Sequence, residues 1–202
     1  MICILNESCI IIMIRSIVNL IVNYLSNNKN YNNEQKEKME YILTIMIYEL
    51  IKFILLIFIL YLLGFLKEGL VVLIAIMITK PFIGGYHEDS QIKCFSATLI
   101  IVCSLIILGE NVQLNIVSIL ILNLFSIFCV YHKAPIINEK MPLTKEKLII
   151  RNKAIGVSNS FIFLTLSIIM FKVRWFSQII VWTSVVQTML LFNKYKKVYG
   201  GR

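Results

Sequence analysis

Residues 41–63 read YILTIMIYELIKFILLIFILYLL, a run whose only charged residues are Glu49 and Lys52. An apolar run of about 18 residues or more with few charges is typical of a helix that crosses a membrane. Gly64 ends the run, and further apolar runs follow along the chain. The stretch therefore predicts an integral membrane protein that is built from helices.

Five further segments downstream have the apolar character of membrane spans. They are residues 69–83, 93–109, 113–131, 154–171 and 175–193. A spanning helix needs about 17–25 residues, so the first of these segments, which also contains Lys80 and Pro81, is expected to be short or re-entrant. Pro81 is also expected to discourage a regular helix at this point. The predicted fold class is all-α, a polytopic membrane protein with about six membrane helices.

The N-terminal residues MICILNESCIIIMIRSIVNLIVNYL are apolar, but they lack the basic start and the small-residue cleavage site of a signal peptide. Because Arg15 interrupts them, we expect an amphipathic interfacial helix, with a true membrane span as the alternative. The polar stretch SNNKNYNNEQKEK, residues 26–38, is predicted to be a loop. Residues 1–33 are thus expected to form an N-terminal segment and loop ahead of a membrane domain at 34–202.

The composition narrows the class of protein. Hydrophobic residues make up 58% of the chain and the mean hydropathy is +0.82. Soluble domains contain about 45–50% apolar residues, so a soluble enzyme is not expected. The net charge of +9 does not indicate nucleic-acid binding, because the basic residues flank apolar spans and form no stripe on a soluble domain. A basic membrane face suits anionic lipid and an acidic peptide instead.

The basic residues also predict the orientation of the chain in the membrane. With both termini inside, the cytoplasmic segments carry 16 Lys and Arg residues, the outer connections carry three, and Lys52 lies within the first span. This bias follows the positive-inside rule, so both termini and residues 80–95 are expected to face the cytoplasm, where thiols stay reduced. The cysteines are Cys3, Cys9, Cys94, Cys103 and Cys129. Their spacing predicts no disulfide framework, no metal and no other cofactor.

Residues 80–95, KPFIGGYHEDSQIKCF, hold a histidine and a cysteine between two apolar runs. An imidazole can take the proton of a nearby thiol and make it a strong nucleophile, so His87 and Cys94 are a candidate catalytic pair. One straight helix would separate them by about 10 Å, whereas proton transfer needs roughly 2.6–3.2 Å. The chain must therefore bend or unwind here, and Gly84 and Gly85 supply backbone freedom. The alternative is an interfacial histidine and a packed cysteine.

Other candidate groups are weaker. Cys129 and His132 are neighbours at helical spacing, but nothing in the sequence around them indicates a pocket, so a packed thiol below an interfacial ring is preferred. Glu88 or Asp89 could orient the imidazole of His87 as the third group of a triad, although solvation at the membrane surface is preferred.

Glu49 and Lys52 are spaced i, i+3 inside the first span. Ionisable residues at membrane depth usually pair or face a polar cavity. Mutual pairing is expected, and a role in lining a peptide-binding cavity is the alternative.

The unit GGYH at 84–87, followed by Cys94, resembles the accessory gene regulator protein B (AgrB) family, membrane peptidases of quorum-sensing systems. Residues 38–64 are similar to the family's first membrane segment, and residues 131–155 are similar to its basic cytoplasmic loop with two prolines. The resemblance runs from about residue 34 to the end of the chain.

Two positions depart from the family's pattern. Lys80 stands where the family commonly has Arg, and Glu88 stands where it has a small residue. Lys80 keeps the charge but lacks the guanidinium fork. The departures concern the fit of the substrate more than the chemistry.

The resemblance implies a cysteine endopeptidase of the bacterial cell membrane. Cys94, activated by His87, would cut the acidic tail from a small precursor peptide with an amphipathic leader and hold the remainder as a thioester. A cysteine or serine of the peptide would then close a thiolactone or lactone ring, the quorum-sensing signal. Backbone N–H groups near Gly84 and Gly85 are candidates for stabilising the oxyanion.

The resemblance also implies a catalytic region at 80–95, a basic cytoplasmic loop at 132–153 that docks the acidic tail, and a homodimer. The candidate substrate-binding residues are Lys80, Glu49, Lys52, Lys133, Arg151 and Lys153. One alternative is a membrane transporter or exporter subunit without covalent catalysis, although the two halves lack the internal symmetry that many transporters have. A structural or sensor membrane protein is a third class.

Overall fold

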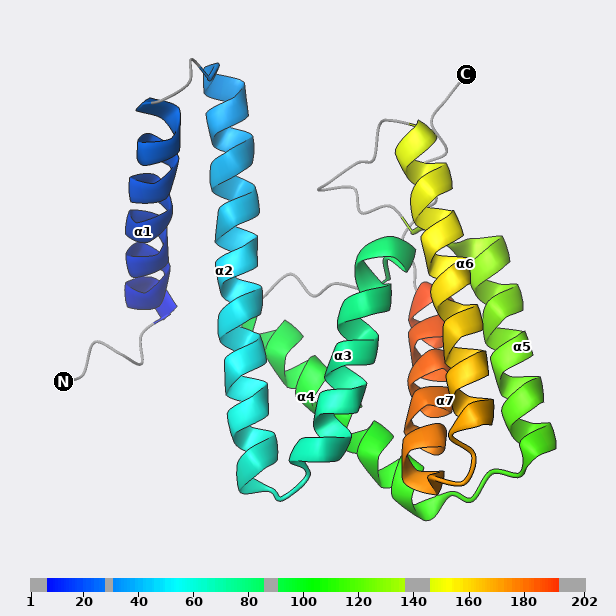
Figure 1. Ribbon diagram of the computed structural model, residues 1–202. Helices are drawn as coiled ribbons and strands as arrows, with labels where there is room; N and C mark the ends of the chain where they lie inside the picture. The colour runs from blue at the N-terminus through cyan, green and yellow to red at the C-terminus, as the bar shows by residue number, and fades with distance from the viewer. Residues whose placement is uncertain (1–6, 28–30, 86–90, 137–145, 193–202) are drawn as a thin grey trace. The chain divides into compact units, whose positions relative to one another are not determined.

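The computed structural model describes residues 7–27, 31–85, 91–136 and 146–192, and the regular structure in these ranges is helical (Figure 1). The helices are α1 (Glu7–Asn27), α2 (Asn33–Leu62), α3 (Leu66–Ile83), α4 (Gln91–Asn111), α5 (Ile116–Lys133), α6 (Glu146–Ile169), α7 (Arg174–Met189) and the 3-10 helix η2 (Leu190–Phe192). The chain divides into two compact units, residues 1–58 and 59–202.

Five helices of the described ranges are long and apolar enough to cross a membrane: α2, α4, α5, α6, and α7 together with η2. The all-α, polytopic membrane architecture predicted from the sequence is therefore confirmed. α3 is 18 residues long but carries Lys67, Glu68 and Lys80. It is not among the five because of these charges, and its 18 residues exceed the 15 predicted for this segment.

α3 differs from the prediction in its start and at its proline. The helix begins at Leu66 and continues through Pro81 to Ile83. Proline disfavours a helix interior because it lacks an N–H and its ring clashes with the preceding turn, but only two residues of α3 follow it. The Asn159 amide of α6 donates to the Ile78 oxygen at 3.0 Å and ties this end of α3 into the bundle. The expectation that Pro81 discourages a regular helix at this point is therefore wrong.

The unit of residues 1–58 is a pair of helices. Within residues 14–26 of α1, whose burial the structure describes, the buried side chains are Ile14, Val18 and Val22. The residues of α2 that pack against them are Met39, Leu43, Ile47 and Tyr48. Because spacings of four residues lie on one helix face, the apolar stripe of α1 is the face that contacts α2. The predicted N-terminal helix is confirmed, and its location at a membrane surface stays a prediction.

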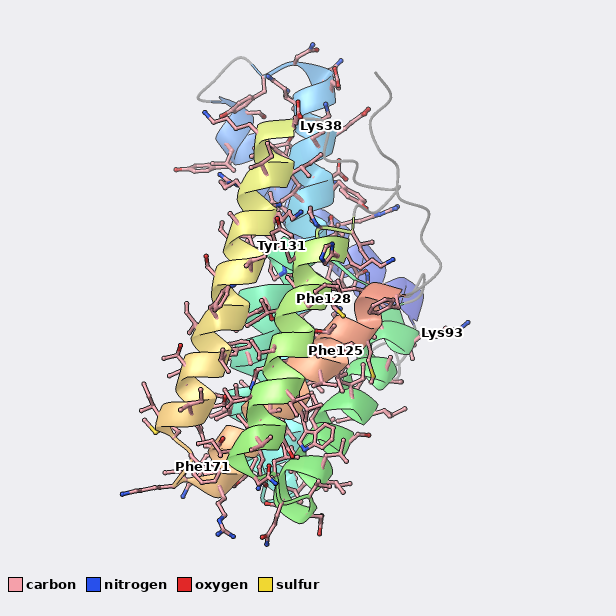
Figure 2. All side chains as sticks on the ribbon, turned by 90° about the vertical axis from the view of Figure 1, so that its right-hand side faces the viewer. Lys38, Lys93, Phe125, Phe128, Tyr131 and Phe171 are labelled. Atoms are coloured by element: carbon pink, nitrogen blue, oxygen red, sulfur yellow. The ribbon has the colours of Figure 1, made fainter. Side chains whose placement is uncertain are left out.

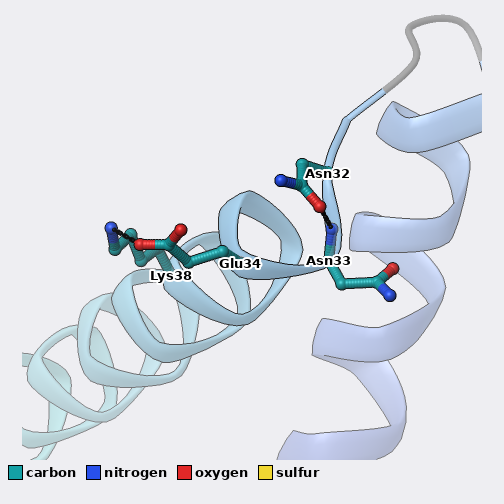
Figure 3. Close-up of polar contacts among 4 residues, drawn as sticks. All are labelled: Asn32, Asn33, Glu34 and Lys38. Atoms are coloured by element: carbon teal, nitrogen blue, oxygen red, sulfur yellow. Dashed lines mark hydrogen bonds and ion pairs between the residues drawn. The ribbon is translucent and has the colours of Figure 1, made fainter.

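The beginning of α2 lies inside the stretch predicted to be a loop (Figure 3). Asn32 accepts a hydrogen bond from the N–H of Asn33 at 2.7 Å, and its own N–H donates to Oε1 of Gln35 at 3.1 Å. These two bonds satisfy N–H groups at the start of the helix, where intrahelical partners are lacking. Glu34 and Lys38 form an ion pair of 2.6 Å at the favourable i, i+4 spacing. The loop prediction is therefore wrong at this point.

The unit of residues 59–202 is a helical bundle around α7. Successive helices from α3 to α7 alternate in direction, and α7 contacts α3, α4, α5 and α6 (Figure 1). Ten of the 16 residues of α7 are buried, and six of them are polar: Ser177, Gln178, Thr183, Ser184, Gln187 and Thr188. Polar side chains in membrane helices usually face the protein interior, which agrees with the central position of α7.

α4 and α7 cross closely at Gly109. A Cβ at this glycine would overlap Cγ1 of Ile179, a fully buried side chain. We expect Gly109→Ala to lower the stability by about 1–3 kcal/mol, the usual effect of overpacking, as measured by the thermal unfolding midpoint in detergent. Ile179→Ala should relieve the overlap, so the double variant should be less destabilised than the sum of the single variants. Additive effects would contradict a direct contact at this crossing.

Candidate functional site

α3 ends in two consecutive glycines, Gly84 and Gly85, which we call the glycine turn. Their φ angles are 74° and 130°, a region that side chains rarely adopt. The Gly84 N–H donates to the Lys80 oxygen at 2.9 Å and so closes the helix. A Cβ at Gly84 would overlap the backbone oxygen of Ile136. Glycine is therefore required at position 84 for both its conformation and the close approach of another backbone.

The segment after α5 packs onto the glycine turn. The N–H of Ile136 donates to the oxygen of Ile83 at 3.0 Å. A buried apolar cluster surrounds this contact and is formed by Ile83, Val130, Ala134 and Leu191, with Ile136 and Val157 packed against it. Four parts of the bundle therefore meet at the glycine turn: the ends of α3 and α5, the first half of α6 and the residues that follow α7.

Cys94 lies in the first turn of α4 and is 9% exposed. Its carbonyl oxygen accepts a hydrogen bond from Oγ1 of Thr98 at 2.8 Å. Thr98, Ile101 and Leu105 follow Cys94 at spacings of four, three and four residues, which places all four on one face of α4. The neighbouring Lys93 is exposed and points outward (Figure 2).

The predicted base His87 lies outside the described residues, as do Glu88 and Asp89, the carboxylates considered as its orienting group. An approach of the imidazole to the Cys94 sulfur therefore stays a prediction. The structure describes both flanks of this segment: the glycine turn before it and the first turn of α4 after it.

A small, mostly apolar pocket opens beside the glycine turn, and we call it the glycine-turn pocket. Both glycines line it, together with Lys80, Ile83, Thr98, Ile101, Leu105 and Gln187. Thr98 is one helical turn, about 5–6 Å along the axis, from Cys94. The structure thus brings three predicted site residues, Lys80, Gly84 and Gly85, to one pocket that begins one turn from the candidate nucleophile.

The rival pair, Cys129 and His132, does not converge. Cys129 is 4% exposed, whereas His132 is exposed on the outer face of α5. The imidazole packs on the rings of Phe128 and Tyr131, with centroid distances of 4.4 and 5.2 Å, and these two side chains lie along α5 beside Phe125 (Figure 2). Within the described residues no hydrogen bond joins the pair, so the structure agrees with a packed thiol and an exposed ring.

Glu49 and Lys52 form the ion pair predicted for the first span. Nζ of Lys52 lies 2.5 Å from Oε1 of Glu49. The Lys52 side chain is 12% exposed and that of Glu49 is 58% exposed. Mutual pairing is confirmed, and the role of the two residues in a peptide cavity stays a prediction.

Basic residues of the predicted cytoplasmic loop lie at the same end of the bundle as the glycine turn. Nζ of Lys133 lies 5.4 Å from the ring centroid of Phe192, and Nζ of Lys153 lies 4.6 Å from that of Tyr131. These are cation–π distances. Arg151 is exposed. In the part of the chain that the structure describes, no group of three His, Cys, Asp or Glu side chains could hold a metal ion.

Sequence reasoning missed two polar residues of the site, Thr79 and Gln187. The Thr79 hydroxyl of α3 lies within hydrogen-bond distance of the Ala75 oxygen and of the side-chain amide of Gln187 of α7, and the Thr79 and Gln187 side chains are buried. Gln187 also lines the glycine-turn pocket. The polar content of the segment 175–193 could have indicated them, because polar residues in a span usually face an interior site.

The fold and the site together define a class: an all-helical, multi-pass membrane protein with a cysteine and basic helix ends beside a glycine turn. The family model described as accessory gene regulator B matches residues 18–191 of the chain. A curated relative, AgrB-like protein 1 of Clostridium perfringens (strain 13 / Type A), is 48% identical over 176 residues, which are 87% of this chain and 94% of the relative. No solved structure gives a significant match.

The chain therefore belongs to the accessory gene regulator B family, and the resemblance inferred from its motifs is confirmed. A role in a quorum-sensing accessory gene regulator system follows from this membership. The apolar helices make the protein a multi-pass membrane protein.

Proposed function

We propose that the protein is a membrane cysteine endopeptidase that cuts the acidic C-terminal tail from a small precursor peptide and prepares the remainder for cyclisation. Cys94 is the nucleophile and His87 is its base. The observation that carries the proposal is the place of Cys94, in the first turn of a helix whose next turn lines the glycine-turn pocket. The peptidase activity is assigned to residues 34–202, with residues 80–95 as the catalytic region.

The surroundings of Cys94 suit this role. The first turn of a helix favours negative charge, because its backbone N–H groups lack intrahelical partners and the helix dipole is positive there. Cys94 is also largely buried, and limited access of water favours transfer of an acyl group to an internal nucleophile over hydrolysis.

The proposed reaction has two acyl transfers. His87 takes the thiol proton, the Cys94 sulfur bonds to the scissile carbonyl carbon, and the C–N bond breaks as the tail's amine receives that proton. The peptide is then a thioester on Cys94. A thiol or hydroxyl of the peptide attacks the same carbonyl carbon, the bond to Cys94 breaks, and the proton returns to the enzyme's thiol. Because the second nucleophile belongs to the bound peptide, ring closure is effectively unimolecular.

The two glycines differ in what they can offer to the oxyanion of these steps. The N–H of Gly84 already donates to Lys80 at the end of α3. Gly85 lines the pocket, and its N–H makes no hydrogen bond with the described residues. We therefore assign the oxyanion donor to Gly85 and a backbone-packing role to Gly84.

The acidic tail of the precursor is proposed to dock on the basic end of the bundle. Lys133, Arg151 and Lys153 lie at this end, and the apolar cluster around Ile83 ties it to the glycine turn. The positive-inside bias of the sequence supports a cytoplasmic location for this end and for both termini. The basic charge also suits binding to anionic lipid, and the family resemblance implies a homodimer.

Charge reversal at the basic end should weaken substrate binding. We expect Arg151→Glu and Lys153→Glu each to raise KM for the precursor about 3–10-fold at low salt, with a smaller rise at high salt, because exposed ion pairs are weak and screened. kcat should change little. Lys172→Glu is the matched control, since Lys172 is exposed and follows the opposite end of α6. An equal effect of the control, or effects that ignore salt, would contradict docking at this end.

The proposal is tested with purified protein in liposomes and the precursor peptide encoded beside its gene. Mass spectrometry should detect the released tail and a ring-closed remainder, without any requirement for a transmembrane gradient. A transporter without covalent chemistry would move peptide across the bilayer and leave its mass unchanged. That outcome would replace the peptidase assignment with the transport alternative.

A further inference from the structure

A second pocket opens at the end of the bundle opposite the glycine turn, and we call it the Arg174 pocket. It has a volume of about 600 Å³ and lies between the end of α4 and the turn that leads from α6 into α7. Its charged side chains are Glu110, Lys172 and Arg174, and Trp175 lines it as well. The proposed peptidase reaction uses none of these residues, so the pocket needs a separate explanation.

The sides of this pocket are fixed to each other by the protein itself. Gln178 of α7 lines the pocket, is 4% exposed and donates to the carbonyl oxygens of Gly109 and Val112 at 2.5 and 3.1 Å. Carbonyl groups at the end of a helix lack intrahelical partners, so these bonds close the end of α4 and hold it against α7. A ligand would therefore meet a pocket that is largely preformed, as binding sites usually are.

The pocket lies at the level where membrane helices end. α4 ends at Asn111, and the span made of α7 and η2 begins at Arg174. The hydrocarbon core of a bilayer is about 30 Å thick, the length of about 20 helical residues, so such helix ends reach the lipid headgroups. Tryptophan is enriched at this level, and Trp175 is half-buried with its ring 5.7 Å from that of Phe176. The pocket is therefore open to lipid headgroups.

The cations of the pocket run against the charge bias of the chain. The connections predicted to lie outside carry three basic residues, Lys67, Lys172 and Arg174, and two of these three line this one pocket. Neither forms an ion pair with a carboxylate of the described residues. Nη1 of Arg174 donates to Oε1 of Gln113 at 3.2 Å, and a guanidinium has five N–H donors. Two cations thus remain available to an anion at this surface.

The charges of the pocket fit an anionic phospholipid. Two cations and the Glu110 carboxylate give the pocket a net charge of +1, which one phosphodiester balances and a zwitterionic headgroup does not. The guanidinium fork of Arg174 matches two phosphate oxygens. The hydroxyls of a glycerol headgroup can donate to Glu110, and Val173 and Trp175 offer apolar contact to the start of the acyl chains. The shared features select a lipid over a soluble phosphate.

We propose that the Arg174 pocket binds one anionic phospholipid with a glycerol headgroup. Its phosphodiester lies between Lys172 and Arg174, its headgroup hydroxyls contact Glu110, and its acyl chains begin beside Trp175. The pocket and the proposed site of the precursor's tail lie at opposite ends of the bundle, so this inference is independent of the peptidase assignment. Because the lipid binds the folded protein, it stabilises the junction of α4 and α7.

Trp175 provides a local reporter for this site. The chain contains two tryptophans, Trp175 and Trp182. Nε1 of Trp182 is buried without a hydrogen-bond partner among the described residues, so Trp182→Phe removes no bond within them and leaves the fluorescence to Trp175. This variant is placed in vesicles of brominated phosphatidylglycerol with unbrominated phosphatidylcholine, and in the reverse mixture. Since bromine quenches only a nearby indole, the two mixtures give the relative binding constants of the two lipids.

Phosphatidylglycerol is expected to bind about 5–30-fold more tightly than phosphatidylcholine, because each basic residue near a membrane surface favours anionic lipid about fivefold. Arg174→Gln in this background should lower the preference about fivefold, and the further change Lys172→Gln should remove it. Arg174→Lys, which keeps the charge, should retain most of it. Lys67→Gln is the matched control, since Lys67 is an exposed cation of the same predicted side outside the pocket, and it should stay within about twofold.

Three outcomes would overturn the site. Equal quenching by the two lipids would show that the pocket does not select an anionic headgroup. An equal loss of preference in Lys67→Gln and Arg174→Gln would assign the effect to general surface charge. The third arm adds glycerol phosphate, the headgroup without acyl chains, which should leave the quenching unchanged at millimolar concentration. Displacement of phosphatidylglycerol by this compound would make the pocket a site for a soluble phosphate ester instead of a lipid.

Discussion

Cys94→Ala is expected to abolish tail release, with a loss of at least about 10⁴-fold in kcat, because removal of a nucleophile leaves only binding and oxyanion stabilisation. Cys94→Ser should be nearly as inactive, since a hydroxyl is a far weaker nucleophile than a thiolate at neutral pH. Product formation is measured by mass spectrometry with the precursor and protein in liposomes. Thermal unfolding of both variants should resemble that of the wild type, because each substitution is small.

The matched control for this prediction is Cys129→Ala. Cys129 is a buried thiol of the same bundle and lies on α5, where His132 faces away toward the outer surface. Its removal should leave kcat within a few-fold of the wild-type value. Full activity of Cys94→Ala, or a loss of activity confined to Cys129→Ala, would assign the chemistry to a different thiol.

Gly84→Ala is expected to be the most damaging Gly→Ala change among the glycines that the structure describes. The new Cβ would overlap the backbone oxygen of Ile136. Because the N–H of Ile136 is hydrogen-bonded to Ile83 at the end of α3, the Ile136 backbone cannot easily move away. A strained backbone conformation alone costs about 1–3 kcal/mol, and the overlap adds to this. We expect a markedly lower thermal midpoint and loss of tail release, because the oxyanion donor assigned to Gly85 follows directly.

Gly64→Ala separates backbone strain from overlap. Gly64 also has a positive φ, of 80°, but a Cβ there would have no neighbour within 4 Å. This variant should lower the midpoint modestly and retain activity. Equal damage from the two substitutions would mean that conformation, and not contact with Ile136, accounts for the requirement at position 84.

Apolar runs predicted the helices well because the length and apolar composition that a membrane-spanning helix needs are local properties of the sequence. Every predicted span has a helix in the structure, and the ion pair of Glu49 with Lys52 followed from helical spacing alone. The errors lie at helix ends. α2 begins earlier than predicted because Asn32 and Gln35 cap it, and α3 passes its proline because so little of the helix remains.

The site was less predictable, because its contacts join parts of the chain that are far apart in the sequence. Gly84 was identified for its backbone freedom, but its closest constraint is Ile136, which comes from the segment after α5. Gln187 escaped notice for the same reason, since its partner Thr79 lies on α3. Residue spacing within one segment cannot reveal such pairs. The polar residues of α7, however, did indicate a helix that faces the protein interior.

The most direct test of the central claim uses a precursor whose ring-forming cysteine or serine is replaced by alanine, so that a thioester cannot be resolved by cyclisation. Intact-protein mass spectrometry of the wild type should then show added mass equal to the precursor minus its tail. Fragmentation should locate that mass on Cys94, and hydroxylamine should remove it. Tail release at the normal rate with no acyl group on Cys94, or with the acyl group on another cysteine, would contradict the account.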